Sequence, residues 1–210
     1  MVVHVAKDGD HIHGIAAAAG FRRVSTVWNA PENANLRALR PNPDTLLPGD
    51  RVTVPDFTSQ TDEGATEKRH RFVALTQRTA VRLRWLRFGH TADAQLQSAF
   101  EPTKTPTPPA DGAGDVTVKI DATTSQISVS TPRGDTTLQV GFLHPFDTES
   151  GWLARLHNLG YLASSAIVQT QIDAIELASA IEEFQCDHGL TVDGQVQSTF
   201  LSALRDAHGC

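Results

Sequence analysis

Residues 41–55, with the sequence PNPDTLLPGDRVTVP, decide the fold at the N-terminal end of the chain. Turn-forming residues lead into a Pro-Gly-Asp corner, and the alternating run RVTV predicts a short strand closed by a proline. A second Gly-Asp corner stands in KDGDHI, residues 7–12, directly after VVHV, which also alternates like a strand. We expect the two strands to share one small module, which would place the two corners near each other.

Helical spacing fills the interval between the two predicted strands. Apolar residues recur at helical intervals in HIHGIAAAAG, residues 11–20, and Gly20 is a typical helix stop. Leu36 and Leu39 mark a second helical piece, for which Asn33 is the expected N-cap. Residues 1–57 are therefore predicted to form a β-α-α-β module.

A change of pattern separates the middle of the chain from this module. Residues 58–68 are small and polar and predict a linker. From Arg69 the apolar period changes to two, and further alternating runs follow up to position 145. Residues 69–145 are therefore predicted to be an antiparallel β-domain that resembles a sandwich. One of its strands would carry a basic outer face, made of Arg82, Arg84 and Arg87.

The C-terminal part returns to helical spacing. Three amphipathic stretches end near Gly160, Gly189 and Gly209, as helices commonly do, and they predict a compact bundle over residues 146–210. The chain as a whole is predicted to be a multi-domain α+β protein. Its expected parts are the β-α-α-β module (1–57), the linker (58–68), the central antiparallel β-domain (69–145) and the helical domain (146–210).

Charge and composition exclude several classes of partner. Residues 146–210 carry two basic and nine acidic side chains, and such a surface repels phosphate, so we expect no nucleic-acid partner. No apolar run approaches the roughly 18–20 residues of a membrane span, so we expect no membrane partner. The N-terminus lacks the basic start and apolar core of a secretory signal. Two distant cysteines, Cys186 and Cys210, make no disulfide framework, which favours synthesis in the reducing cytoplasm.

The N-terminal module resembles a LysM domain. The residues that carry the resemblance are HVAKDGDHIHGIAAAAGF, VWNAPENANL and LLPGDRVTVP. It implies binding of N-acetylglucosamine-containing glycan, such as peptidoglycan, in a groove between the loop after the first strand and the loop before the last. This implication places Gly9, Asp10, His11 and Ile12 on one wall and Thr45, Leu46 and Leu47 on the other. The sequence departs from the LysM pattern in a longer connecting loop and in His11, where threonine is common.

The C-terminal part resembles the three-helix peptidoglycan-binding domain that is often attached to cell-wall hydrolases. The residues that carry this resemblance are WLARLHNLGY and AIEEFQCDHGLTVDGQVQSTFLSAL. The segment ASSAIVQTQI departs from the pattern, because no Asp-Gly follows Tyr161. The candidate glycan- or partner-binding residues here are Asn158, Tyr161, Gln185 and Asp193.

The whole arrangement is similar to LysM plus peptidoglycan-binding proteins associated with contractile injection machines, notably type VI secretion spike loci. VWNAPENANLRALRPNPDTLLPGDRVTVP, RHRF and LQVGFLHPF…GWLARLHNLGY carry this similarity. It implies an accessory, adaptor or cargo-linked role. A cargo of such a machine would reach the periplasm or a target cell without a signal peptide.

Catalytic and metal-binding patterns are weak. His11 and His13 stand two residues apart at a helix start, so we expect them to point to different faces, and Cys186 and His188 have the same spacing. The sequence contains no HExxH, GxSxG or Cys-His nucleophile pattern. The protein is therefore predicted to be no enzyme, with no metal site and no cofactor.

Structural roles compete with ligand binding at several positions. An aspartate after glycine favours turns, so Asp10 and Asp50 have a structural interpretation as well as a functional one. Gln185, next to an apolar core position, has the alternative of satisfying backbone groups. Asn158 and Tyr161, near a helix end, are better ligand candidates.

Three hypotheses about function stay open. The first is a non-catalytic protein that grips peptidoglycan through both terminal modules. The second is an assembly protein in which the same folds bind a spike, baseplate or effector protein. The third and weakest is a toxin or immunity protein with an activity in the middle domain. A polar, open groove in the LysM-like module would favour the first hypothesis, and an apolar, sealed one the second.

Overall fold

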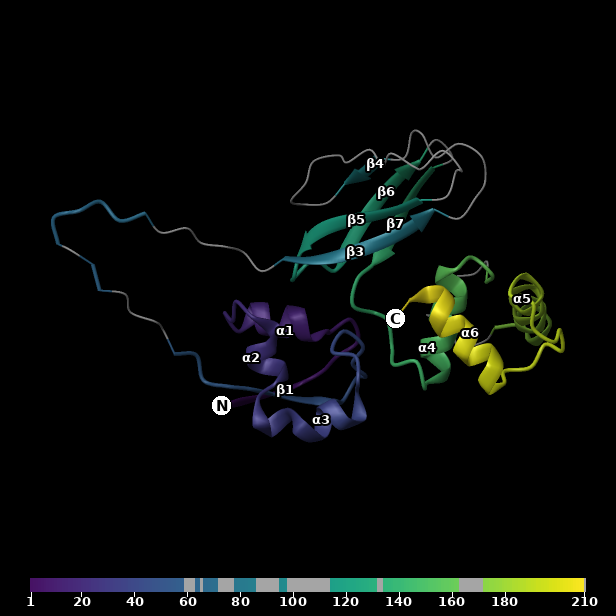
Figure 1. Cartoon of the computed structure of the whole chain (residues 1–210), viewed down its shortest axis with the longest axis horizontal. Coiled ribbons are helices and arrows are strands. Elements are labelled where there is room, and N and C mark those ends of the chain that lie inside the picture. The colour runs from purple at the N-terminus through teal and green to yellow at the C-terminus, as the bar shows by residue number, and fades with distance from the viewer. Residues whose placement is uncertain are drawn as a thin grey trace. The chain divides into compact units, whose positions relative to one another are not determined.

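The computed structural model describes residues 1–58, 63–64, 66–71, 78–85, 95–97, 114–131, 134–162 and 172–209. The chain divides into two compact units, Met1–Phe142 and Leu143–Cys210, which we call unit 1 and unit 2 (Figure 1). Unit 1 contains helices and small antiparallel sheets, and every regular element of unit 2 is a helix within the described ranges. The mixed α+β class with a C-terminal helical region is thus confirmed, and the four-part division stays a prediction. None of the helices described is both long and apolar enough to span a membrane.

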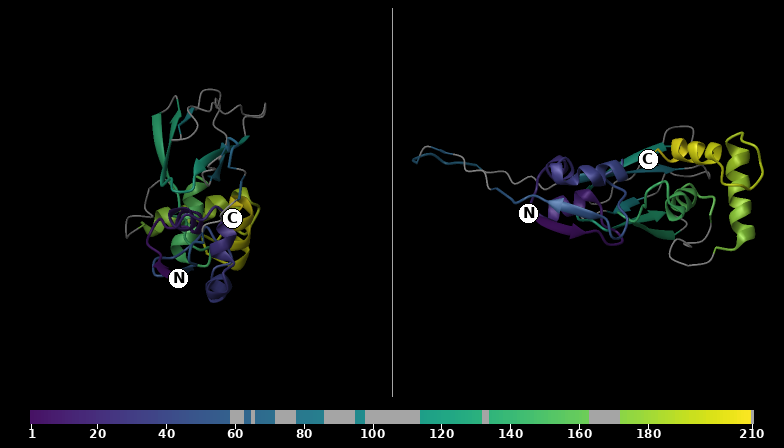
Figure 2. Two further views of the ribbon diagram at one scale, coloured as in Figure 1. Left: turned by 90° about the vertical axis from the view of Figure 1, so that its left-hand side faces the viewer. Right: turned by 90° about the horizontal axis from the view of Figure 1, so that it is seen from below.

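Unit 1 begins with a strand pair that encloses short helices. Strand β1 (Val2–Val5) pairs antiparallel with β2 (Arg51–Val54) (Figure 2). Val2 is opposite Val54 and Val5 is opposite Arg51. Between them lie α1 (Ile12–Ala18), α2 (Val24–Trp28), the 3-10 helix η1 (Pro31–Asn33) and α3 (Ala34–Leu39). Pro31 is the first residue of η1, and its ring cannot donate a backbone hydrogen bond. The helical interval between residues 24 and 39 is therefore divided.

A small apolar core holds this strand-helix module together. Ile12 and Ile15 of α1 are one helical turn apart and both are buried, and Val27 and Val52 are fully buried from α2 and β2. The complete set of buried members is Ala6, Ile12, Ile15, Ala16, Val27, Leu36, Leu46, Val52 and Val54.

Asn33 has a different role from the helix cap that the sequence predicted. Its side chain makes no capping bond to α3. Instead its Nδ2 donates to the carbonyls of Val27 and Thr53, and its Oδ1 accepts from the Thr53 amide, all at 2.8 Å. The side chain is buried, and the bonds cross 20 residues of sequence to strand β2. Asn33 stands at the N-cap position of α3 as predicted, but its side chain does not cap the helix, because it is directed toward the backbone of Val27 and of strand β2.

The rest of unit 1 is built from β-strands. Strand β3 (Arg78–Trp85) pairs antiparallel with β5 (Gly114–Asp121), and β6 (Gln126–Thr131) lies between β4 (Gln95–Gln97) and β7 (Gly134–Gln139). Val118 and Ile120 of β5 share one buried cluster with Ile127 and Val129 of β6. Arg82 is exposed, as the alternation predicts, whereas Arg87 lies outside the described residues.

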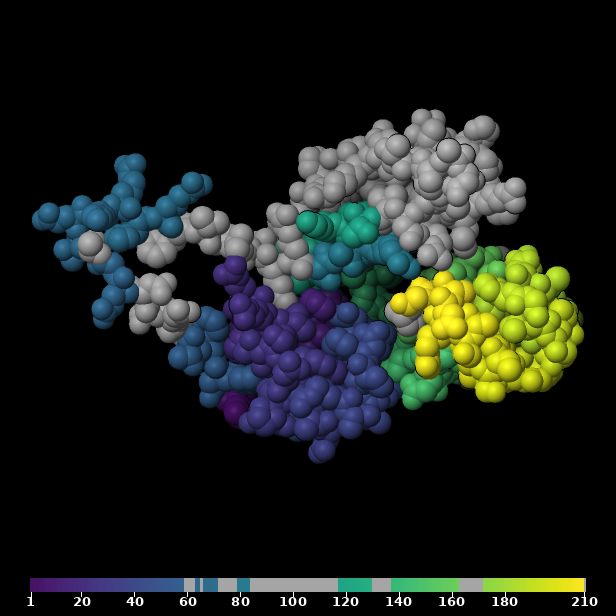
Figure 3. Space-filling model, in the orientation of Figure 1, coloured from purple at the N-terminus to yellow at the C-terminus, as the bar shows by residue number. Residues whose placement is uncertain are grey.

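Unit 2 contains the three helices that the sequence predicts. They are α4 (Glu149–Asn158), α5 (Ala174–Asp187) and α6 (Ser198–His208). Each is followed by one of the three predicted glycines, Gly160, Gly189 and Gly209, in the left-handed region. In the space-filling view the side chains of α5 and α6 make up much of the visible surface of this unit (yellow-green and yellow; Figure 3). Most of the segment ASSAIVQTQI, positions 163–171, lies outside the described residues.

Aromatic rings fill the centre of unit 2. Phe184 and Phe200 are fully buried with ring centroids 5.3 Å apart, and Trp152 packs edge-on against Phe200 at 6.3 Å. Arg155 is also buried, with Nη1 donating to the carbonyls of Gly151 at 2.7 Å and His144 at 3.0 Å. The guanidinium group therefore fixes the entry of the chain into α4.

Candidate functional site

The first candidate site lies where the two Gly-Asp corners meet. Beyond the paired strands, the Ala6 amide donates to the Asp50 carbonyl and the Gly49 amide to the Ala6 carbonyl, both at 2.8 Å. These bonds continue the β1–β2 ladder as far as the corners. The expectation that the two corners lie near each other is confirmed.

Both aspartates of the corners hold their own turns. The Asp10 carboxylate accepts from the Lys7 amide at 2.8 Å and lies 2.7 Å from His4 Nε2. Burial alone would raise the pKa of Asp10, but the hydrogen bonds from His4 and Lys7 outweigh it and lower the pKa.

The Asp50 carboxylate is more deeply enclosed. It accepts from Arg40 Nε at 2.9 Å and Nη2 at 3.3 Å, and from the Leu47 amide at 2.9 Å. The side chains of Arg40 and Asp50 are only 9% and 8% exposed, so this bidentate ion pair is buried. The structural interpretation of Asp10 and Asp50 accounts for all of these contacts.

The walls selected from the LysM resemblance are partly core. Ile12 is 0% exposed, Leu46 3% and Thr45 4%, and the Ile12 amide donates to the Pro43 carbonyl at 3.4 Å. The two walls therefore touch each other, and these three side chains are not available to a ligand at the surface. Of the wall residues, Gly9, Asp10 and Leu47 keep partial exposure.

Phe142 is a neighbour of this corner that sequence reasoning did not select. A Cβ atom added to Gly9 would lie 2.8 Å from Phe142 Cζ, so the aromatic ring packs directly on the glycine backbone. Phe142 keeps 37% of its surface exposed. An aromatic face beside a glycine corner is a surface on which a sugar ring can stack. Phe142 lies 133 positions after Gly9 in the sequence, so no local pattern connects the two residues.

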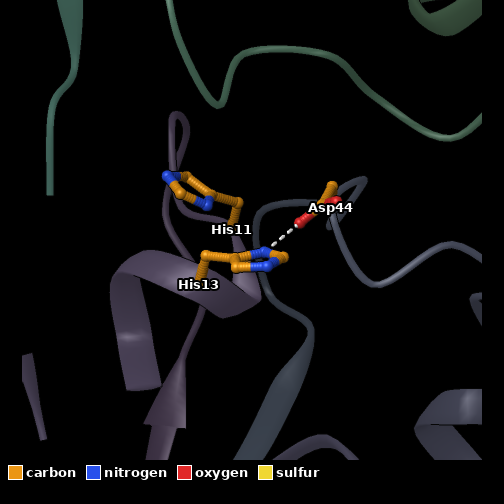
Figure 4. A group of neighbouring side chains, drawn as sticks. All are labelled: His11, His13 and Asp44. Atoms are coloured by element: carbon orange, nitrogen blue, oxygen red, sulfur yellow. Dashed lines mark hydrogen bonds and ion pairs between the residues drawn. The ribbon is translucent and has the colours of Figure 1, made fainter. Parts of the chain in front are cut away.

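Three potential metal ligands gather at the same corner. One ligand atom each from His11, His13 and Asp44 lies within 4.8 Å of the others (Figure 4). His13 Nδ1 and Asp44 Oδ1 are 2.5 Å apart. The expectation that the two histidines diverge was wrong, because His11 is not helical: its backbone is extended, with φ −141° and ψ 158°, and it serves as the N-cap of α1. Burial lowers the pKa of His11, and Asp44 opposes that shift.

The second candidate site is on unit 2, beside the end of α4. The Tyr161 hydroxyl donates to Asp187 Oδ2 at 3.0 Å, and its ring packs edge-on against Phe184 at 5.2 Å. Asn158 Nδ2 lies 3.3 Å from His208 Nε2. Burial first, and then the Asp187 carboxylate, raise the pKa of Tyr161 to about 12. The phenol therefore stays protonated and keeps its donor.

The side chains of Gln185, on α5, and of Asp193 hold the loop between α5 and α6 in place. Gln185 is buried, and its Oε1 accepts from the amides of Asp193 at 2.9 Å and Gly194 at 3.0 Å. Its Nε2 donates to Asp193 Oδ1 at 2.8 Å and to the Gln195 carbonyl at 3.2 Å. All polar atoms of Gln185 have partners within the loop, so Gln185 shapes the surface rather than presenting a group to a ligand.

Comparison with known families identifies one part of the chain. A family model described as a peptidoglycan binding domain matches residues 154–204. This range begins within α4 and ends within α6, and it contains Asn158, Tyr161, Gln185 and Asp193. No curated protein and no solved structure matched the chain. Residues 154–204 are thus a domain of the peptidoglycan-binding kind, and peptidoglycan is the partner that this domain indicates.

Proposed function

We propose that the chain is a non-catalytic accessory protein that binds peptidoglycan, primarily through unit 2. The match of residues 154–204 to the peptidoglycan-binding family carries this proposal. The second candidate site offers hydrogen-bonding groups beside an aromatic ring, which suits binding of a glycan.

The contact surface on unit 2 is proposed to centre on Tyr161. Its phenol and the Asp187 carboxylate form one polar edge, and the amide of Asn158 is three positions away on the last turn of α4. Glycan recognition uses such a combination, in which hydroxyls and acetamido groups hydrogen-bond while a ring face packs on an aromatic side chain.

A second, weaker glycan contact is proposed in unit 1, at the LysM-like corner where the loop after β1 meets the loop before β2. The observed order of β1, the helices and β2, with two adjoining Gly-Asp corners, supports the LysM resemblance. Two weak sites on one chain would reinforce each other, since binding at one raises the effective concentration at the other. The central strands, whose two sheets share one buried cluster, are proposed to be a sandwich-like spacer. A link to a contractile injection machine rests on the sequence resemblance.

Co-sedimentation of the purified full chain with insoluble peptidoglycan sacculi tests the proposal. The variant Tyr161→Phe/Asp187→Asn removes the polar edge and keeps the aromatic ring on Phe184, so the fold should persist while binding weakens. Asp206→Asn is the matched control, because it removes one exposed carboxylate of α6 and leaves Tyr161 and Asp187 in place. Wild-type binding that survives in the double variant would refute the assigned surface, and a folded wild-type chain that never sediments would refute glycan binding.

A protein partner is the alternative function, and one observation favours it. Both walls of the LysM-like groove contribute apolar side chains to one closed core, which contains Ile12 and Leu46. In unit 2, Val192 and Val196 expose 53% and 39% of their surface on the α5–α6 loop. An adaptor for a spike, baseplate or effector protein would use such apolar contacts. Binding of that kind would be unaffected by soluble peptidoglycan fragments added as competitors.

A further inference from the structure

We propose that His11, His13 and Asp44 form a binding site for a divalent transition-metal ion of the zinc class. The site lies in unit 1, apart from the residues matched to the peptidoglycan-binding family, and goes beyond the proposed function. Two imidazole nitrogens and one carboxylate oxygen are the donor set that suits zinc, nickel and copper ions, whereas calcium and magnesium prefer oxygen ligands alone.

The spacing of the three donors fits one ion after small side-chain movements. Zinc holds imidazole nitrogen and carboxylate oxygen at about 2.0–2.2 Å, so ligand atoms around one tetrahedral ion lie about 3.4 Å apart. The present atoms lie within 4.8 Å of one another, with His13 and Asp44 closer together than the ion requires. His13 and Asp44 have side chains 24% and 53% exposed, so both can rotate into place.

The backbone around the three ligands is already fixed. His11 is buried at the N-cap of α1, where its Nδ1 accepts a long hydrogen bond of 3.3 Å from the Gly14 amide. Asp44 is held by its own amide, which donates to Asn42 Oδ1 at 2.9 Å. The Ile12–Pro43 hydrogen bond joins the two loops. A cluster whose backbone is held in place loses little conformational entropy when an ion binds.

Ion binding would replace the direct His13–Asp44 contact with two metal bonds. Three protein ligands leave at least one coordination position for water or another donor, and the partial exposure of His13 and Asp44 gives solvent access to it. The ion would also join the loop after β1 to the loop before β2. It would therefore stabilise unit 1 by its preference for the folded state.

Calorimetric titration of the full chain, prepared without a polyhistidine tag, with zinc chloride tests the site. We expect one ion per chain in wild type. His13→Gln and Asp44→Asn should each weaken zinc affinity by at least about 10–100-fold, the loss typical even for a group that only orients a ligand. His70→Gln removes another exposed histidine of unit 1 and should leave affinity unchanged. Both ligand variants replace partly exposed side chains, which keeps loss of fold from explaining the result.

Cobalt substitution gives a second, independent measurement. Cobalt bound by His11, His13 and Asp44 should show visible absorption bands that both ligand variants lose and the His70 control keeps. Failure of wild type to bind stoichiometric zinc would overturn the proposal, as would ligand variants that bind as tightly as wild type. Neither result bears on sacculus binding by unit 2, so the metal site and the proposed function stand or fall separately.

Discussion

Replacement of Gln185 by alanine should loosen the loop between α5 and α6 without unfolding the chain. Gln185 is 3% exposed and supplies an acceptor to the amides of Asp193 and Gly194 and a donor to the Gln195 carbonyl. Each such bond contributes about 1 kcal/mol net, and alanine offers no substitute, so we expect local stability to fall by about 2–3 kcal/mol. That loss corresponds to about 30- to 150-fold weaker protection of the loop amides against hydrogen exchange, since every 1.4 kcal/mol is a factor of ten.

Hydrogen–deuterium exchange read by mass spectrometry measures this loss where it occurs. Amides of the loop at 190–197 and of the first turn of α6 should exchange faster in Gln185→Ala, while peptides from α1 in unit 1 serve as an internal reference. Gln197→Ala is the matched control, because Gln197 is exposed and its side chain donates to Asp193 Oδ2 at 2.6 Å. Equal protection in wild type and Gln185→Ala would refute the assignment of Gln185 as the organiser of this loop.

Three further predictions concern single residues. Gly9→Ala should lower the unfolding midpoint of unit 1, because φ is +87° and the new Cβ would collide with the Phe142 ring; about 1–2 kcal/mol is expected from the left-handed backbone alone, measured by urea unfolding. Arg40→Gln should lower the free energy of unfolding by about 3–5 kcal/mol in the same assay, since it leaves the Asp50 carboxylate buried without its cationic partner. A loss below about 1 kcal/mol would contradict this role. The Asp193 carboxyl has a pKa lowered by hydrogen bonds, from the Gln195 amide first and the Gln185 side chain next, so its contribution is complete above the unfolded pKa and is lost as pH falls through the lower folded value. The thermal unfolding temperature of unit 2 should therefore fall when the pH drops below about 4, and it should fall less in Asp193→Asn.

Local sequence was sufficient for several elements of both terminal parts. Apolar residues three and four positions apart predicted α1, α5 and α6, and a glycine with a left-handed backbone follows each helix of unit 2. The signals act within one or two helical turns, so they can be found without knowledge of the fold. The same holds for the turns at Asp10 and Asp50, whose carboxylates bond amides three residues away.

Side-chain partners at longer range were not predictable in the same way. Asparagine is a residue type that often caps helices, yet the side chain of Asn33 bonds to the backbone of Val27 and of Thr53 on strand β2. Local capping and long-range bonding compete for the same side chain, and the pairing of β1 with β2 decides between them. For Gln185 the neighbouring core position suggested a role in satisfying backbone groups, but nothing near it in the sequence shows which loop returns to its side chain.

The sequence alone determined most helical and strand elements at the two ends of the chain, the two Gly-Asp corners and the peptidoglycan-binding pattern of unit 2, because each is encoded by neighbours along the chain. Only the tertiary structure decided which side chains meet. His13 and Asp44 are 31 positions apart and become partners through the contact between the two corners. His11 joins them because its backbone is extended at the helix cap rather than helical. A side chain's direction depends on backbone angles and packing over the whole module, which residue spacing does not specify.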